Sequence, residues 1–323
     1  KAEEGRRTGI GITAEGDMLA ALGLKYGSED ATDFSEEVHK TVALEAYRSS
    51  VHLAADRGAF AIYSTEREKN NPLIRRIRVA DPGLYEEMTR FGRRNIALLT
   101  IAPTGTTSLM TQTTSGIEPV FMPVYRRRRK VNPNDKDVRV DFIDEVGDHW
   151  EEYTVFHHKF KTWMEVNGHD VTRKYSQEEL DELVSRSPYY QATSNDVDWV
   201  AKVHMQGRIQ KWVDHSISVT INLPSHVSEE LVGKLFFEAW KSGCKGVTVY
   251  RDGSRSGVLI SDKKEDKKKP AGFPTKRPEI LEADVVRFRN NKDNWVAFIG
   301  LIENMPYEIF TGHADHFWIP GWV

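Results

Sequence analysis

The chain of 323 residues has one cysteine, Cys244, and no long run of apolar residues. A single cysteine excludes an internal disulfide framework, and no cysteines and histidines are spaced as in a structural zinc site. No segment approaches the roughly 18 apolar residues of a membrane span, and the start of the chain has no apolar signal core, which predicts a cytoplasmic protein without a membrane partner. The net charge is only −3, so the composition does not favour a nucleic acid as a partner either.

Hydrophobic residues make up 39% of the chain, enough for a substantial core in one large domain or two ordinary ones. Between residues 217 and 250 the order strand, turn, helix, strand is typical of a parallel α/β sheet. The helix is expected to begin at Ser228 and to end near Gly243. The positions expected to face the sheet are Leu231, Leu235, Phe236 and Ala239.

Three helices are predicted before residue 95. Residues 8–24 read as a short buried helix, and a stronger helical pattern starts at Asp33 or Ser35 and stops at Gly58. A third helix is predicted over residues 81–92, because Asp-Pro at its start and glycine at its end are typical helix boundaries.

The stretch from about 125 to 197 has a different composition, and we interpret it as an elaboration on the fold. Its basic run, residues 126–130, is interpreted as a solvated edge, and the alternative is a clamp for a nucleotide or an acidic partner. Ser176 and Glu179 predict a capping box at the start of a helix, and residues 204–212 are also expected to be helical.

The last 60 residues are expected to be separate from the rest. Residues 261–279 are charged and interrupted by prolines, which predicts an exposed linker between residues 1–260 and 280–323. Within the second part, segments 283–288 and 295–302 are expected to form a β-hairpin, with a third strand at 307–310.

Residues 99–120 are the most informative stretch, because an apolar run leads directly into a turn made of small hydroxyl residues. Pro103 and Gly105 break the run, and residues 108–110 can open a helix. Backbone N–H groups freed at the break, together with hydroxyl groups, would surround a phosphate without a cationic side chain. The alternative is that these residues simply cap a helix after a strand. The hydroxyl groups belong to Thr104, Thr106, Thr107 and Ser108.

Residues 102–108 (Ala-Pro-Thr-Gly-Thr-Thr-Ser), followed by Ser-Gly-Ile-Glu-Pro at 115–119, resemble the substrate-phosphate loop of the ribonucleotide reductase catalytic subunit. Residues 7–12 and 243–255 resemble the same family in the same order, and the last stretch is most similar to the adenosylcobalamin-dependent (vitamin B12, class II) branch. The resemblance implies an α/β fold, the second half of a ten-stranded reductase barrel, followed by a small β segment. The substrate-binding residues that it implies are Pro103, Thr104, Gly105, Thr106, Thr107, Ser108, Gly116 and Glu118, although Glu118 with Pro119 is equally typical of a strand-ending turn.

The activity implied is reduction of a ribonucleotide to a 2′-deoxyribonucleotide by a thiyl radical, with adenosylcobalamin as cofactor. Complete members of the family need several cysteines, so this chain is expected to be a fragment without activity of its own, with the radical cysteine upstream of residue 1. The alternative is a noncatalytic nucleotide-binding subunit of a split reductase. The implied partners are a ribonucleotide, the upstream half of the reductase in cis or trans, an external dithiol such as thioredoxin, and a second copy in a homodimer.

Other chemistry-bearing residues are given structural roles. Cys244 lies between a helix end and a strand, where cysteine is usually a small hydrophobe, and Tyr250 is expected to pack at the end of its strand. The polar turn at residues 251–255 would lie at the carboxyl edge of the sheet, where α/β proteins collect ligands. The histidines are scattered without metal-site spacing, so no metal site is predicted.

Overall fold

The computed structural model describes residues 2–131, 138–144, 148–252, 254, 277–290 and 292–316. The chain divides into two compact units, one made of residues 1–127 and 154–259 and the other of residues 128–153 and 260–323. The linker expected at 261–279 lies almost wholly outside the described residues, as do Gly253 and Arg255 of the polar turn. Within the described ranges, no helix combines the length and the apolarity needed to cross a lipid bilayer.

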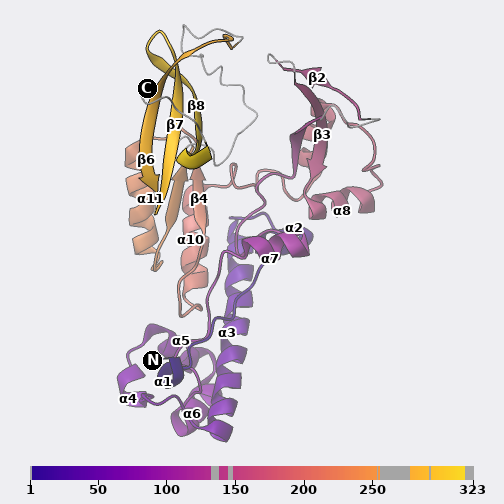
Figure 1. Ribbon diagram of the computed structural model, residues 1–323. Helices are drawn as coiled ribbons and strands as arrows, with labels where there is room; N and C mark the ends of the chain where they lie inside the picture. The colour runs from indigo at the N-terminus through magenta and orange to yellow at the C-terminus, as the bar shows by residue number, and fades with distance from the viewer. Residues whose placement is uncertain are drawn as a thin grey trace. The chain divides into compact units, whose positions relative to one another are not determined.

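The helices of the first unit begin and end largely where local signals place them (Figure 1). The Ser28 side chain accepts a hydrogen bond from the Ala31 N–H, so the long helix begins earlier than expected, and it ends at Gly58, whose φ is +78°. The capping box at Ser176 and Glu179 is confirmed. The helices are α1 (Ala2–Gly5), α2 (Glu15–Ala21), α3 (Glu29–Arg57), α4 (Thr65–Glu68), α5 (Pro72–Ala80), α6 (Pro82–Phe91), α7 (Gly105–Thr111), α8 (His158–Val166), α9 (Gln177–Arg186), α10 (Trp199–Gln210) and α11 (Glu229–Lys241).

Four extended segments of the first unit, residues 8–12, 97–101, 215–223 and 248–251, pair in parallel in that order. Residues 8–12 pair with 97–101 through the bridge Ile10 to Leu99, and residues 97–101 pair with 215–218 through the bridge Ile101 to Ile217. Strand β4 (Thr220–Leu223) then pairs in parallel with β5 (Thr248–Arg251), which confirms the strand, helix, strand order expected there. The described residues form no closed barrel.

The helix expected over residues 8–24 is wrong in its first half, which is extended, because α2 begins only at Glu15. Glycines at positions 9 and 11 let the segment lie against residue 100. A Cβ atom at Gly11 would be 2.0 Å from the carbonyl oxygen of Thr100, so only glycine fits this backbone approach.

The run 97–101 is extended but forms only isolated bridges, since part of its backbone bonds to a side chain. The carboxylate of Asp214 accepts the N–H groups of both Leu98 and Leu99, at 2.8 Å each. A carboxylate thus takes the place of a neighbouring strand at these two residues.

Two apolar clusters hold the parallel segments. One joins α3, α5 and α6 to residues 98–101, with Tyr47, Ile77 and Leu84 fully buried in it. In the other, Leu235 and Ala239 of α11 pack on β4, whereas Phe236, expected to face the sheet, is 49% exposed. The reason is that position 236 lies about 100° around the helix from Leu235.

A small sheet carries the basic run of residues 126–130. Its strands are β1 (Val124–Lys130), β2 (Phe142–Ile143) and β3 (His149–Phe156), in the order β1-β3-β2. Arg128, Arg129 and Lys130 form ion pairs with Glu152, Glu151 and Asp148, at 3.0, 2.7 and 2.6 Å. All three cations are more than half exposed, as on a solvated edge.

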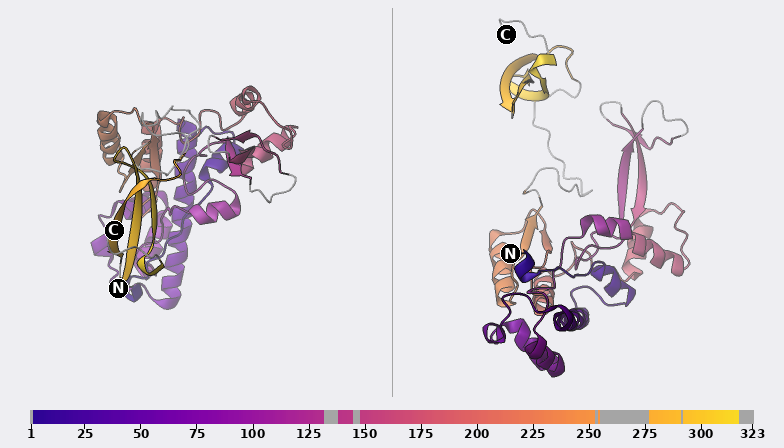
Figure 2. Two further views of the ribbon diagram at one scale, coloured as in Figure 1. Left: turned by 45° about the horizontal axis from the view of Figure 1, so that its top comes forward. Right: turned by 60° about the horizontal axis from the view of Figure 1, so that its bottom comes forward.

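The C-terminal part is an antiparallel sheet of three strands, β6 (Glu282–Asn290), β7 (Asp293–Ile302) and β8 (Met305–His313), in chain order, followed by a short 3₁₀ helix (Figure 2). The expected hairpin and third strand are therefore confirmed. Glu303 and Asn304, which join β7 to β8, both have positive φ, as in the two-residue turns that match the twist of a hairpin.

Candidate functional site

The turn at Thr104 directs the start of α7. Thr104 has a φ of +50°, in the left-handed region that a β-branched residue rarely adopts, and its side chain does not cap the helix. The first N–H groups of any helix have no partner within it, so the N–H groups of Gly105, Thr106 and Thr107 are left without a capping side chain. This leaves backbone donors available to an anion.

The structure divides the predicted hydroxyl residues into two pairs. The Thr104 hydroxyl lies 3.0 Å from that of Thr13 and accepts the Gly116 N–H at 2.8 Å, and the buried Ser108 hydroxyl donates to the Gly105 carbonyl at 2.9 Å. Thr106 and Thr107 are exposed. The first pair therefore shapes the turn, and the second pair faces outward beside the backbone donors.

Residues 13–17 form hydrogen bonds with residues 114–116, at the carboxyl-terminal end of the loop. The Ala14 and Glu15 N–H groups donate to the Thr114 and Gly116 carbonyls, at 3.0 and 3.2 Å. Gly116 is buried with a φ of +52°, and a Cβ atom there would lie 3.1 Å from the Ala102 carbonyl oxygen. The backbone at position 116 therefore requires glycine.

Glu118 is bound on both of its carboxylate oxygens. One oxygen accepts the N–H of Thr220 at 2.6 Å and the other lies 2.5 Å from Nζ of Lys202, a lysine that is 2% exposed. Glu118 therefore joins the loop to strand β4. Pro103 and Gly105 are exposed next to the start of α7.

Two buried tyrosines, Tyr26 and Tyr189, form hydrogen bonds with the loop or with Asp17 beside it. The Tyr26 hydroxyl donates to the Ile117 carbonyl, and burial, together with the nearby Glu118 and Glu15 carboxylates, raises the pKa of this tyrosine well above its usual value. Burial and the Asp17 carboxylate likewise raise the pKa of Tyr189. Both phenols are neutral donors at physiological pH.

Sequence reasoning missed Thr13, Asp17, Thr114 and Lys202, which hold the loop in place. Each forms its contact with a partner 84 to 103 positions away in the chain, so a pattern of spacing does not point to it. Asp17 and Lys202 are charged residues that the fold buries to 6% and 2% exposure.

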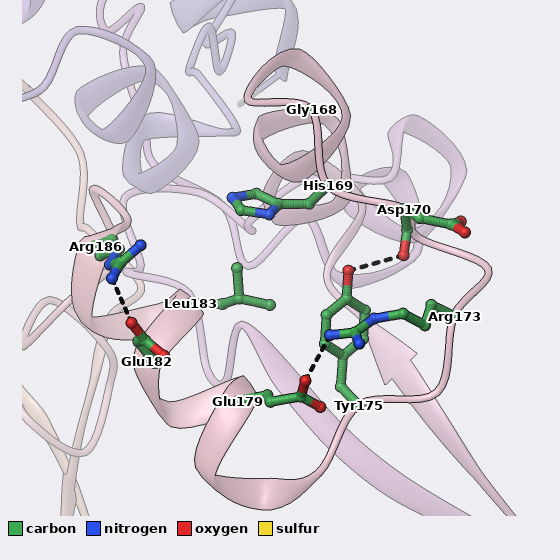
Figure 3. Close-up of a pocket in the computed structure, with 9 residues that line it drawn as sticks. All are labelled: Gly168, His169, Asp170, Arg173, Tyr175, Glu179, Glu182, Leu183 and Arg186. Carbon is green, nitrogen blue, oxygen red and sulfur yellow. Dashed lines mark hydrogen bonds and ion pairs between the residues drawn. The ribbon is translucent and has the colours of Figure 1, made fainter.

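A cavity of about 320 Å³ lies elsewhere, between the loop that follows α8 and the helix α9 (Figure 3). Its lining residues come from 168–186, and none belongs to the 99–120 stretch. The two arginines that line it are paired, Arg173 with Glu179 and Arg186 with Glu182. The cavity is therefore not the predicted phosphate site.

The remaining chemistry-bearing residues occupy structural positions. Cys244 packs with the cluster on α11, and burial raises the pKa of its thiol to about 11. Tyr250 is half-buried in β5. Among the described residues, no three His, Cys, Asp or Glu side chains are placed to hold a metal ion.

Comparison with known families decides the identity. Residues 1–250 match the family described as "Ribonucleotide reductase, barrel domain". The chain belongs to the ribonucleotide reductase family. Residues 281–323 of this reductase chain match a second family, "NrdJ homologue C-terminal domain". The family predicted from residues 7–12, 102–119 and 243–255 is confirmed.

Curated relatives of this reductase domain are named as vitamin B12-dependent enzymes. The ribonucleoside-diphosphate reductase of Mycobacterium tuberculosis is 29% identical over 266 residues, covering 79% of this chain and 32% of that protein. The Thermoplasma acidophilum enzyme is 27% identical, with 82% and 31% covered. The Streptomyces clavuligerus ribonucleotide reductase is 24% identical, with 87% and 31% covered. The chain spans about a third of the length of these relatives.

Among solved structures, the α subunit of the Actinobacillus ureae class Id ribonucleotide reductase is similar, with a TM-score of 0.53 and 15% identity. The match covers 78% of this chain and 40% of that one. At this identity the likeness shows the fold alone, and it confirms the predicted α/β fold of reductase type.

Proposed function

We propose that this chain is the substrate-phosphate-binding part of a vitamin B12-dependent ribonucleotide reductase, which converts ribonucleotides to 2′-deoxyribonucleotides. The observation that carries the proposal is the family match over residues 1–250. It is supported by the names of the relatives, which state vitamin B12 dependence. The geometry agrees, because the start of α7 combines free backbone donors with two outward hydroxyl groups.

In this proposal the loop residues have two kinds of role. The N–H groups of residues 105–107 and the hydroxyls of Thr106 and Thr107 donate to the phosphate oxygens of the nucleotide. Thr104, Ser108 and Gly116 hold the turn in shape, and Glu118 anchors it to β4. Pro103 directs the chain into the turn. The protein binds the anion with dipoles, so no lysine or arginine is required.

The radical chemistry is assigned to the rest of the reductase. The family resemblance calls for a radical cysteine and a reducing cysteine pair, whereas Cys244 is the one cysteine of this chain. We therefore propose that the other two-thirds of the enzyme, in cis or in trans, supplies the cysteines. An external dithiol such as thioredoxin would restore the pair, and a homodimer and a cytoplasmic location stay predictions.

Vitamin B12 enters this proposal only through the names of the relatives. When bound in a reductase of this branch, adenosylcobalamin supplies the radical. In this proposal the described residues bind the substrate phosphate, and the cofactor is bound by the complete reductase.

Binding of cytidine diphosphate and of pyrophosphate tests the proposal directly. Isothermal titration of the chain should show binding. Thr106→Ala with Thr107→Ala should weaken it about a hundredfold or more, since the variant removes two hydrogen bonds to a charged group and each contributes about 1.5–3 kcal/mol. Thr41→Ala with Thr89→Ala is the matched control, because both threonines are exposed on helices and bond to a carbonyl four residues earlier. Equal affinities for both double variants and the unchanged chain would contradict the proposal.

Complementation separates the two forms of the proposal. The part of a relative such as the Thermoplasma acidophilum enzyme that this chain does not match, added in trans, should restore reduction of a ribonucleotide if this chain is a natural split subunit. Turnover only after fusion into one polypeptide would instead identify the chain as a fragment. The Thr106, Thr107 double variant should lower turnover in whichever form is active.

A further inference from the structure

One buried carboxylate joins the phosphate loop to the elaboration at residues 125–197. Asp17, on α2, is 6% exposed, and its Oδ2 accepts the N–H of Thr114 at 2.8 Å. Its Oδ1 lies 2.8 Å from Nε2 of His157 and accepts the hydroxyl of Tyr189 at 2.9 Å. A carboxylate with this little exposure needs such donors, because burying a charged carboxylate without hydrogen bonds strongly destabilises the folded state.

The two donors on the far side of Asp17 come from the elaboration. His157 immediately precedes α8, and Tyr189 follows α9. Their rings contact each other edge to face, at 5.9 Å between centroids, and Tyr189 also packs on Phe160. The same apolar cluster includes Ala20 of α2 and Val120, so the elaboration is packed against both segments that frame the loop.

The connection continues from Asp17 to the turn. Asp17 and Thr114 bond reciprocally, since the Asp17 N–H donates to the Thr114 hydroxyl at 3.2 Å. Two residues later the Gly116 N–H donates to the Thr104 hydroxyl, which defines the start of α7. A shift of Asp17 would therefore move the residues that hold the backbone donors.

We propose that His157 and Tyr189 are positioning residues for the phosphate loop, acting through Asp17, so that the elaboration controls the affinity of the loop for nucleotide phosphate. This inference rests on the proposed function only in naming the ligand. The coupling itself is a property of the chain: loss of either donor leaves a buried carboxylate underbonded, and Asp17 then moves and loosens Thr114. The elaboration is thus a regulatory element of the binding site.

Hydrogen exchange of the full chain tests the coupling without any ligand. Tyr189→Phe and His157→Ala should raise the exchange rates of the Thr114 and Gly116 amides about tenfold, and His157→Gln, which retains a donor, should restore slow exchange. The neighbours offer matched controls, because Tyr190 and His158 are both exposed. Tyr190→Phe and His158→Ala should leave these amides unchanged.

The affinity of each variant for pyrophosphate completes the test. We expect Tyr189→Phe and His157→Ala to weaken binding about tenfold, with the controls at the affinity of the unchanged chain. Faster exchange confined to residues 154–190 would overturn the inference and show a merely local role. Faster exchange at 114–116 in a chain that binds no pyrophosphate would instead refute the proposed ligand and leave the coupling standing.

Discussion

Nζ of Lys202 lies 2.5 Å from a carboxylate oxygen of Glu118, in a pair that joins α10 and the loop at residues 102–119 to strand β4. The lysine also donates to the Thr220 carbonyl at 2.7 Å, and Glu118 accepts the Thr220 N–H, so the pair satisfies both backbone polar groups of Thr220. Such a buried pair adds little net stability over an apolar one, but breaking it is costly.

Lys202→Met should therefore destabilise the chain by about 3 kcal/mol, because it leaves Glu118 without its counter-charge. Glu118→Gln, added to Lys202→Met, should recover part of the loss, since the amide oxygen still accepts the Thr220 N–H and carries no charge. Urea unfolding measures both effects. Lys159→Met is the control, because Lys159 is exposed on α8, and a similar loss there would contradict the assignment.

Gly11→Ala should destabilise the chain by about 3 kcal/mol or more, because the new Cβ atom would lie 2.0 Å from the Thr100 carbonyl oxygen and would force residues 8–12 away from 97–101. Gly233→Ala provides the contrast. Gly233 is in the interior of α11 with open space around it, so alanine should stabilise by about 1 kcal/mol through helix propensity. Thermal unfolding compares the two, and equal shifts would refute the close approach at Gly11.

The Cys244 thiol should be slow to alkylate. Burial raises its pKa from 9.0 to about 11, so at pH 8 the thiolate fraction, and with it the rate with iodoacetamide, should be about a hundredfold below that of the unfolded chain in urea. The rate in the folded chain should continue to rise up to about pH 11. A plateau above pH 9 in the folded chain would show that the thiol is not buried as described.

Stability should fall at alkaline pH. The raised pKa values of Tyr26 and Tyr189 mean that the folded chain retains protons which the unfolded chain loses above pH 10, so their contribution is complete below pH 10 and decreases as the pH rises further. Each tyrosine contributes a slope of up to about 1.4 kcal/mol per pH unit. Urea unfolding between pH 9 and 11 should show a shallower loss for Tyr26→Phe than for the unchanged chain. Tyr190→Phe, at an exposed site, should have the same slope as the unchanged chain.

Several helix boundaries were predictable because they depend on residues three or four apart. The box at Ser176 and Glu179, the cap at Asp81 and the helix start at Ser228 are local arrangements, and the structure contains all three. The prediction failed over residues 8–12, where Ile10 and Ile12 are two positions apart, as in a strand, and the backbone pairs with residues 97–101. The helix predicted over 8–24 overlooked this alternation.

The sequence by itself determined the family, the parallel α/β order and the position of the loop rich in hydroxyl groups, because these depend on short motifs and local propensity. Only the tertiary structure decided that Thr104 and Ser108 are occupied within the turn while Thr106 and Thr107 face outward. It also brought Asp17 to Thr114, 97 residues away, and to Tyr189, 172 residues away. The physical reason is that a buried polar group bonds to whichever partner the packing of the whole chain brings near, and no pattern of neighbouring residues encodes that choice.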